Sequence, residues 1–259
     1  MTKEKEFDYI AWQIETFNNK AGNLHEQDDI NCEKCKNKGY IYELKGEDEI
    51  VVIQCSCMKE RKVMKELRES GLSLQFKKNT FENYTTNEKW QSTVLKTAKE
   101  YLNEIVRDGK KHWFYMSGQV GSGKTHICTA ISYWLIKYGY GFKYFAYGRE
   151  MGSLQRGLQS FNVEAREKAE RKMEELTTVD VLYIDDFLKA TKTIDHLFEL
   201  IDTRHANDKI TILSGEKSFD EIRLLDEAIA SRIFGKTTQK YWLNISKGSD
   251  KDHRRKQNE

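Results

Sequence analysis

Residues 118–125 read Gly118-Gln119-Val120-Gly121-Ser122-Gly123-Lys124-Thr125, which matches every fixed position of the phosphate-loop pattern G-x-x-x-x-G-K-[ST]. An apolar run at 113–116 precedes this loop, and a segment with helical periodicity at 125–138 follows it. In such a strand–loop–helix unit, glycines let backbone N–H groups face phosphates at the positive end of the helix. We therefore predict that these residues bind ATP, with Lys124 on the β and γ phosphates and the Thr125 hydroxyl on Mg²⁺.

Strand and helix patterns alternate on both sides of this loop. Short apolar runs, typical of buried strands, are separated by longer segments with helical periodicity. Strands are predicted at 113–116, 142–146, 181–184, 210–213 and 241–245, and helices at 87–107, 125–138, 163–175, 193–206 and 218–232. No element is assigned to the glycine-punctuated segment 147–156. This alternation indicates an α/β fold, in which a parallel sheet is covered by helices on both faces.

Two carboxylates end the predicted strand at 181–184. Asp185 would lie at the strand tip and hold Mg²⁺, and Asp186 would orient the attacking water or act as the base. An Asp-Asp pair also suits an ordinary turn, but its place about 60 residues after Lys124 favours catalysis. Ser214, at the end of the next predicted strand, is a candidate γ-phosphate sensor, although a single polar residue there often caps the following element.

Four of the five cysteines fall in two close pairs, Cys32-x-x-Cys35 and Cys55-x-Cys57. Four thiolates from two pairs suit a tetrahedral Zn²⁺ in a small module that folds on the metal. The second pair has one spacer residue rather than two, so a redox-active dithiol stays open as the alternative to a zinc site. The fifth cysteine, Cys128, falls on the helix after the phosphate loop and is predicted to be a core residue.

Composition limits the remaining classes of function. The 259 residues carry 43 basic and 41 acidic side chains, so a nucleic-acid site would have to be a local patch. No apolar run is long enough to cross a membrane, and the charged N-terminus lacks the apolar centre of a signal peptide. We therefore expect a cytoplasmic chain, in which paired cysteines are metal ligands or free thiols more often than disulfides.

Three parts of the chain are distinguished by pattern. Residues 1–70 combine the cysteine pairs with predicted helices at 3–20 and 58–69, and the stretch after the first of these helices is polar. The ATPase domain is expected at 71–247, and a polar tail at 248–259. The first part is too small to build a large apolar core, which is a second reason to expect a metal there.

Two basic segments are candidate contacts for nucleic acid. Residues 59–78 carry seven basic side chains against three acidic ones, which suits a phosphate backbone as well as a solvated linker helix. Arg149 and Arg156 lie among glycines after the second predicted strand, where they are candidates for contact with single-stranded DNA.

Taken together, these features resemble the DnaC/DnaI helicase loader family, in the form carried by phages and mobile elements. The resemblance covers nearly the whole chain. Besides the cysteine pairs, the phosphate loop and the acid pair, it rests on short sequences spread along the chain. These are Lys38-Gly39, Met58-Lys59 with Arg61, Ser70-Gly71-Leu72, Thr80-Phe81 and Asp226-Glu227-Ala228-Ile229-Ala230-Ser231-Arg232-Ile233.

The resemblance implies an AAA+ P-loop ATPase that loads the replicative hexameric helicase during replication initiation. It implies a zinc-binding N-terminal module that grips the helicase, and an ATPase core that self-associates and binds single-stranded DNA. By the same resemblance, Arg232 is an arginine finger for the ATP of a neighbouring subunit, and the stretch around Phe81 lies near the adenine.

The chain departs from this family at two places, and two other functions stay open. It has Ser214-Gly215-Glu216 where many relatives carry a Thr-Ser-Asn-like sensor, and it ends soon after the last strand, so Arg254 or Arg255 is the candidate second sensor. A transposition helper ATPase of the IstB type shares the core but generally lacks the cysteine module. A zinc-containing adaptor that binds ATP without hydrolysis is disfavoured by the intact loop and acid pair.

Overall fold

The structure is a computed structural model that describes residues 3–46, 49–69, 78–189, 195–246 and Gly248. It divides into two compact units, Met1–Gly71 and Leu72–Glu259, and each is described by itself. No helix in the described ranges has the length and apolar content that crossing a membrane requires.

A short hairpin between the two cysteine pairs forms the centre of the N-terminal unit. Its strands pair antiparallel, with Tyr40 opposite Gln54 and Lys45 opposite Glu49. The polar stretch after the first helix contains a five-residue helix that the sequence did not predict, because so short a segment shows no period. In chain order the elements are α1 (Lys3–Asn19), α2 (Leu24–Asp28), β1 (Tyr40–Lys45), β2 (Glu49–Gln54) and α3 (Cys57–Glu69).

Lys38 joins the end of α1 to the cysteine loop. Its ammonium group donates to the carbonyl oxygens of Phe17, Asn18 and Lys20, at 2.6, 2.8 and 2.9 Å. The last carbonyls of a helix have no partner within the helix, and a cation beside them is favourable. Lys38 therefore fixes how the chain passes from α1 into the hairpin.

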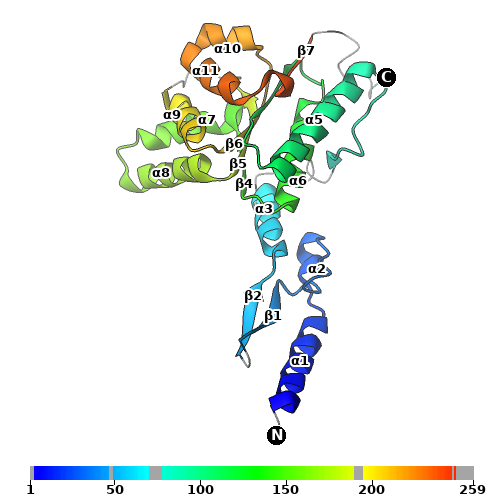
Figure 1. Cartoon of the computed structure of the whole chain (residues 1–259). Helices are drawn as coiled ribbons and strands as arrows, with labels where there is room; N and C mark the ends of the chain where they lie inside the picture. The colour runs from blue at the N-terminus through cyan, green and yellow to red at the C-terminus, as the bar shows by residue number, and fades with distance from the viewer. Residues whose placement is uncertain (1–2, 47–48, 70–77, 190–194, 247, 249–259) are drawn as a thin grey trace. The chain divides into compact units, whose positions relative to one another are not determined.

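A parallel five-stranded sheet in the order β4-β5-β6-β3-β7 forms the second unit, which confirms the predicted fold class (Figure 1). Its strands are β3 (Phe114–Gly118), β4 (Phe142–Ala146), β5 (Val181–Phe187), β6 (Ile210–Gly215) and β7 (Trp242–Ile245). Its helices are α5 (Lys89–Asp108), α6 (Lys124–Lys137), α7 (Tyr147–Leu158), α8 (Val163–Thr178), α9 (Asp195–Ala206), α10 (Phe219–Leu225) and α11 (Glu227–Lys236), with the short 3-10 turn η1 (Gln239–Tyr241) before β7.

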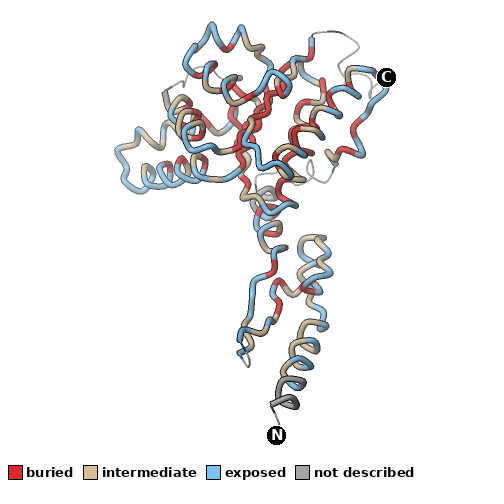
Figure 2. The backbone as a smooth tube through the Cα atoms, viewed as in Figure 1, coloured by how far each residue is buried: buried red, intermediate tan, exposed pale blue. Residues whose placement is uncertain are grey.

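Helices cover both faces of this sheet, with α5 and α6 on one side and α7, α8 and α9 on the other (Figure 1). Figure 2 shows the buried residues concentrated on the strands and on the helix surfaces that face them. Because side chains alternate along a strand, Leu182 and Ile184 of β5 join the large apolar cluster with α7 and α9. Asp185 lies on the other face, where its carboxylate approaches Thr125 at the start of α6.

The segment 147–156, to which no element was assigned, belongs to the helix α7. Tyr147, Met151 and Leu154 recur at helical spacing and are buried against the sheet. Their burial outweighs the roughly 1 kcal/mol by which each helical glycine is unfavourable. Gly157 serves the packing, because a Cβ there would lie 2.7 Å from the Cβ of Ala169 on α8.

The predicted helix 218–232 is two helices in the structure. Asp226 adopts an extended backbone (φ −158°, ψ 108°) that ends α10, and its carboxylate accepts a hydrogen bond from the Ile229 N–H at 2.8 Å. An aspartate that caps the second helix in this way explains the break.

The carboxyl ends of β3, β5 and β6 meet at one edge of the sheet. Met116 of β3 is opposite Ser214 of β6, and Ile184 of β5 is opposite Leu213. The register between β5 and β6 shifts after Ile184, and Asp186 has a left-handed backbone (φ 55°). This edge therefore brings together the ends of the phosphate-loop strand, the acid-bearing strand and the strand of Ser214, where open parallel sheets bind their ligands.

Candidate nucleotide site and cysteine cluster

The phosphate loop requires glycine at two of its positions for different reasons. A Cβ on Gly118 (φ 144°) would lie 2.7 Å from the carbonyl oxygen of Ile245 on β7. Gly123 (φ 83°) takes the left-handed backbone from which α6 begins at Lys124, with the ring of Tyr84 directly beside it. The loop thus passes from β3 into a helix N-terminus that carries no acidic residue in its first turn, which favours an anion.

Lys124 lies against its own loop and is largely buried. Its ammonium group donates to the carbonyl oxygens of Gly118 and Gln119, both at 2.8 Å. Burial lowers the pKa of Lys124, and nearby carboxylates, Glu216 first among them, oppose this shift. A cation held at the mouth of the loop by two carbonyls can exchange them for phosphate oxygens, which are stronger partners.

Three further residues of the loop, Gln119, Val120 and Ser122, differ in their contacts. Ser122 donates its hydroxyl to the Gln119 carbonyl at 2.8 Å. The side-chain amide of Gln119 exchanges two hydrogen bonds with the backbone of Gly248, at 2.8 and 2.9 Å. Val120 is 47% exposed and leaves the outer side of the loop open.

Asp185 receives several hydrogen bonds on a single carboxylate. Tyr144 and Tyr183 donate their phenolic hydroxyls to it, each at 3.0 Å, and Ser214 donates as well. The Thr125 hydroxyl lies 3.5 Å from the same carboxylate. Asp185 and Thr125, both predicted to hold Mg²⁺, are therefore neighbours, and their oxygens are the donors this cation prefers.

The hydroxyl of Ser214 is engaged within the protein. Ser214 is 1% exposed, and besides its bond to Asp185 it lies 3.0 Å from the Tyr183 hydroxyl. A hydroxyl has one proton to donate, and here it is used on Asp185. The role of Ser214 as γ-phosphate sensor stays a prediction, and its geometry here is that of a residue that positions Asp185.

Asp186 faces a cleft of about 400 Å³ beside the sheet edge. Its carboxylate is half-exposed and pairs with the ammonium group of Lys189 at 3.0 Å. Lys189 also lies 3.8 Å from the Glu216 carboxylate. The sequence reasoning missed Lys189, whose only signal is a cation three positions after an acid. The cleft is lined by Tyr144, Ala146, Gly148, Arg149, Asp185, Asp186 and Lys189.

Residues 80–84 pack beside the start of α6. Phe81 is buried, and the His126 ring bonds the Thr80 carbonyl at 2.7 Å through Nε2. Tyr84 meets the His126 ring edge-on, with centroids 5.2 Å apart. The stretch that the resemblance places near the adenine is therefore adjacent to the phosphate loop within this unit.

The arginines singled out from the sequence lie in different settings. Arg232, on α11, pairs with Asp202 of α9, donates to the Ala228 carbonyl at 3.1 Å and stacks over the Phe198 ring at 4.5 Å. Arg149 is 64% exposed, and the Arg156 side chain bonds Ser153 at 3.0 Å. The second-sensor candidates, Arg254 and Arg255, lie outside the described residues.

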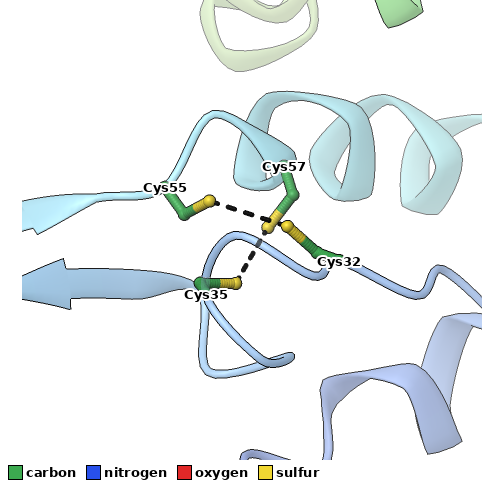
Figure 3. A group of neighbouring side chains, drawn as sticks. All are labelled: Cys32, Cys35, Cys55 and Cys57. Carbon is green, nitrogen blue, oxygen red and sulfur yellow. Dashed lines mark hydrogen bonds between the residues drawn. The ribbon is translucent and has the colours of Figure 1, made fainter. Parts of the chain in front are cut away.

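The four paired cysteines converge in the N-terminal unit (Figure 3). Their sulfurs all lie within 4.8 Å of one another, with Cys32 and Cys55 3.8 Å apart and Cys35 and Cys57 3.6 Å apart. Zn–S bonds of about 2.3 Å in a tetrahedron separate the sulfurs by about 3.8 Å, so the donor set fits Zn²⁺. A disulfide needs about 2.05 Å, and each of these cysteines is free.

The cysteines are held by the elements around them. Cys32 and Cys35 lie in the loop before β1, Cys55 directly follows β2, and Cys57 begins α3. Burial acts to raise the pKa of Cys35, but the Gly39 N–H, which donates to its sulfur at 3.3 Å, and the other thiols lower it to about 7. Burial raises the pKa of Cys32 and of Cys57, so the case for a metal rests on the distances between the sulfurs.

Arg61 links the cysteine cluster to α2. Its guanidinium pairs with Asp28 and donates to the Ile30 carbonyl at 2.8 Å, and it is 6% exposed. Burial lowers its pKa, but hydrogen bonds with Asp28 and Cys57 outweigh this and raise it. Arg61 is therefore not on the basic surface predicted for 59–78, because its charge is neutralised inside the unit. Arg68 and Lys77 of that surface lie outside the described side chains.

Comparisons with known proteins agree with this geometry. The family described as the bacterial DnaA ATPase domain matches residues 75–238. The chain is 33% identical to the uncharacterized protein YqaM of Bacillus subtilis over 70% of its length, and spans 59% of that relative. It is 29% identical to the phage-like element PBSX protein XkdC of the same organism, over 84% of this chain and 83% of XkdC.

Helicase loaders are also among the similar proteins. The replicative helicase loader DnaC of Buchnera aphidicola is 28% identical over 69% of this chain and 73% of its own length. The crystal structure of the DnaC helicase loader superimposes with a TM-score of 0.53 at 20% identity, over 66% of this chain and 98% of that one. The resemblance drawn from the sequence is confirmed, and at this level of identity the structural match shows the AAA+ fold alone.

Proposed function

The chain belongs to the family of the bacterial DnaA ATPase domain, and from this premise we propose that it binds ATP with Mg²⁺ and hydrolyses it. One observation carries this proposal: the Thr125 hydroxyl lies 3.5 Å from the Asp185 carboxylate. Both lie at the edge of the sheet where β3 leads into the phosphate loop. Lys124 is held at the same loop. The phosphate loop, the Lys124 ammonium group and the oxygens of Thr125 and Asp185 that would bind the metal therefore lie together at this edge of the sheet.

In the proposed reaction the chain positions the phosphates and the attacking water. Backbone N–H groups of residues 118–125 hold phosphate oxygens, and Lys124 turns from its two carbonyls to the β and γ phosphates. Thr125 and Asp185 would hold Mg²⁺, which supplies positive charge beside the phosphates. Asp186 would orient the water and take its proton. Because Asp186 is paired with Lys189, this role requires Lys189 to move.

The four cysteines would hold a structural Zn²⁺. The four thiolates would fill every ligand position of a tetrahedral Zn²⁺, which would leave no open position for catalysis. The metal would cross-link the loop before β1, the end of β2 and the start of α3. Its role would be to order the N-terminal unit.

We infer that the whole protein acts as an ATP-dependent loader of a replicative hexameric helicase in replication initiation. Support comes from the similarity to helicase loaders named DnaC and from the small cysteine unit before the ATPase unit. The N-terminal unit would grip the helicase, and the ATPase unit would gate its delivery. XkdC, which belongs to a phage-like element, supports the same reading for the phage form.

Self-association and single-stranded DNA are the remaining parts of the proposal. Arg232 would act on the ATP of a neighbouring subunit, which requires it to exchange Asp202 for a phosphate of that nucleotide. Arg149 borders the cleft at the sheet edge, and with Arg156 it would contact the DNA backbone from α7.

Co-elution with the replicative helicase of the host tests the loader function. The protein and the helicase are mixed with ATP or with ADP and separated by size, for the unchanged chain, Lys124→Ala and Cys32→Ser/Cys35→Ser. We expect a complex with the unchanged chain, its loss with the cysteine variant, and its retention with Lys124→Ala, which should bind the helicase without hydrolysing ATP.

A parallel hydrolysis assay separates the two levels of the proposal. Phosphate release that depends on Lys124, together with no helicase complex in either nucleotide, would reject the loader function and leave the ATPase in place. A helicase complex without measurable hydrolysis would instead identify a zinc-containing adaptor.

A further inference from the structure

Lys189 occupies a specific place at the nucleotide edge of the sheet. It lies two residues after the end of β5, and its backbone N–H bonds the Asp186 carbonyl at 3.1 Å, which closes a tight turn over the acid pair. Two residues of this turn, Asp186 (φ 55°) and Leu188 (φ 58°), have left-handed backbones that side chains rarely adopt. Strain of this kind is concentrated at functional sites, where it fixes a side chain in place.

The ammonium group of Lys189 lies between two carboxylates. It is 3.0 Å from Asp186 and 3.8 Å from Glu216, which directly follows β6. All three side chains are about half-exposed, so these ion pairs are weak and can exchange partners. Of the described residues that line the cleft, Lys189 is the cation that contacts the candidate base.

Neither Ser214 nor Glu216, at the end of β6, offers a side-chain donor that could serve in its place. The Ser214 proton is used on Asp185, and the hydroxyl is buried. Glu216 carries a carboxylate, which accepts hydrogen bonds and repels a phosphate. Asp185 lines the same cleft as Asp186 and Lys189, and its carboxylate lies 3.5 Å from the Thr125 hydroxyl, so this cleft adjoins the phosphate end of the site.

We propose that Lys189 senses the γ-phosphate, leaving Asp186 and Glu216 for a γ-phosphate oxygen when ATP is bound and returning to them when it is lost. The exchange has two consequences. ATP gains a charge-assisted hydrogen bond that ADP cannot make, so the site distinguishes the two nucleotides. The Asp186 carboxylate is released to orient water only while a γ-phosphate is present. This inference rests on the proposed nucleotide site.

Nucleotide affinity tests this assignment in the full chain. The Kd of ADP and of AMPPCP, an ATP analogue that is not hydrolysed, is measured with Mg²⁺ by calorimetry for the unchanged chain, Lys189→Ala and Lys189→Arg. Lys96→Ala, an exposed change on α5, is the matched control. We expect Lys189→Ala to weaken AMPPCP about tenfold and ADP by less than about twofold, with Lys189→Arg close to the unchanged chain.

The two nucleotides make the outcomes distinct. Unchanged ADP binding shows that the variant is folded and that its loop is intact. Equal weakening of both nucleotides, or no change in either, would overturn the role of Lys189 and leave the nucleotide site standing. No binding of either nucleotide by the unchanged chain would overturn the nucleotide site and the role of Lys189 together.

Discussion

The N-terminal unit and the second unit are each stabilised internally by different interactions. In the N-terminal unit, four of the six residues in the core cluster are cysteines, accompanied by Ile41 and Met58. In the second unit, each strand of the parallel sheet buries aromatic or aliphatic side chains, and Trp113 and Tyr115 are fully buried. Burial of such side chains stabilises a fold by about 1.5–3 kcal/mol each.

The difference shows where each unit is vulnerable. A unit of 71 residues with thiols at its centre buries too little apolar area for a stable fold, so it needs a further stabilising element such as a bound metal. The second unit has a sufficient core, so its weak points are the polar groups buried within it.

The largest effect is expected from breaking the cysteine cluster. Cys32→Ser/Cys35→Ser should abolish zinc binding and unfold the N-terminal unit, because structural zinc supplies much of the folding free energy of such modules. Zinc per chain is measured by mass spectrometry, and hydrogen exchange reports each unit separately. The nucleotide unit should keep its protection.

Cys128→Ala is the matched control for that change. Cys128 is buried on α6 in the other unit, so this variant should keep its zinc and lose stability in the second unit only. Full zinc content in the double cysteine variant, or a collapse of both units together, would contradict the comparison.

A buried arginine is the corresponding weak point of the second unit. Arg204 is 0% exposed and bonds the Leu176 and Val179 carbonyls at 2.8 and 2.9 Å and the Thr211 hydroxyl at 3.0 Å. Arg204→Met should lower the free energy of unfolding of this unit by at least about 3 kcal/mol, because it leaves buried carbonyls at the end of α8 without donors.

Chemical denaturation followed through the second unit measures this loss. Arg171→Met, an exposed change on α8, should alter the same free energy by less than about 0.5 kcal/mol. Zinc content should be unchanged in both variants. A loss below about 1 kcal/mol for Arg204→Met would mean that the carbonyls find other partners.

A smaller effect is expected from Arg61 beside the cysteine cluster. Arg61→Met removes a buried cation whose charge acts on Cys57 and which pairs with Asp28. Groups that support metal ligands contribute about 10- to 100-fold in metal affinity. Competition with a coloured chelator measures the affinity, with the exposed Lys62→Met as control. Unchanged zinc affinity would show that Arg61 only anchors α2.

Sequence patterns predicted the second unit better than the details of either site. Strand β4 was predicted at its observed bounds, 142–146, because its apolar run is bounded by clear breaks. Helix α7 was not assigned, although Tyr147, Met151 and Leu154 recur at helical spacing, because its glycines were interpreted as breaks. Packing against β5 and α8 outweighs the low helix propensity of those glycines.

The same limit explains the residues that were missed in the sites. The spacing of the four cysteines in the sequence was enough to predict that they form one cluster, because two ligand pairs at the ends of a hairpin lie close together. Arg61 looked like a surface cation, because nothing in its neighbourhood shows that Asp28, 33 positions earlier, lies beside it. Lys189 has no motif position, and its role depends on a turn with two left-handed residues that sequence patterns do not reveal.

The smallest expected effect concerns pH and the second unit alone. Burial lowers the pKa of His126, and its hydrogen bond to the Thr80 carbonyl only partly opposes this. The folded state therefore holds the neutral ring, so the contribution of His126 is full above the unfolded pKa of about 6.5 and is lost as the pH falls below it. Thermal unfolding at pH 7.5 and 5.5 should show this loss, and His126→Gln should reduce it. His25→Gln, an exposed change in the other unit, should leave the loss intact. An identical pH dependence in His126→Gln and the unchanged chain would assign the loss to other groups.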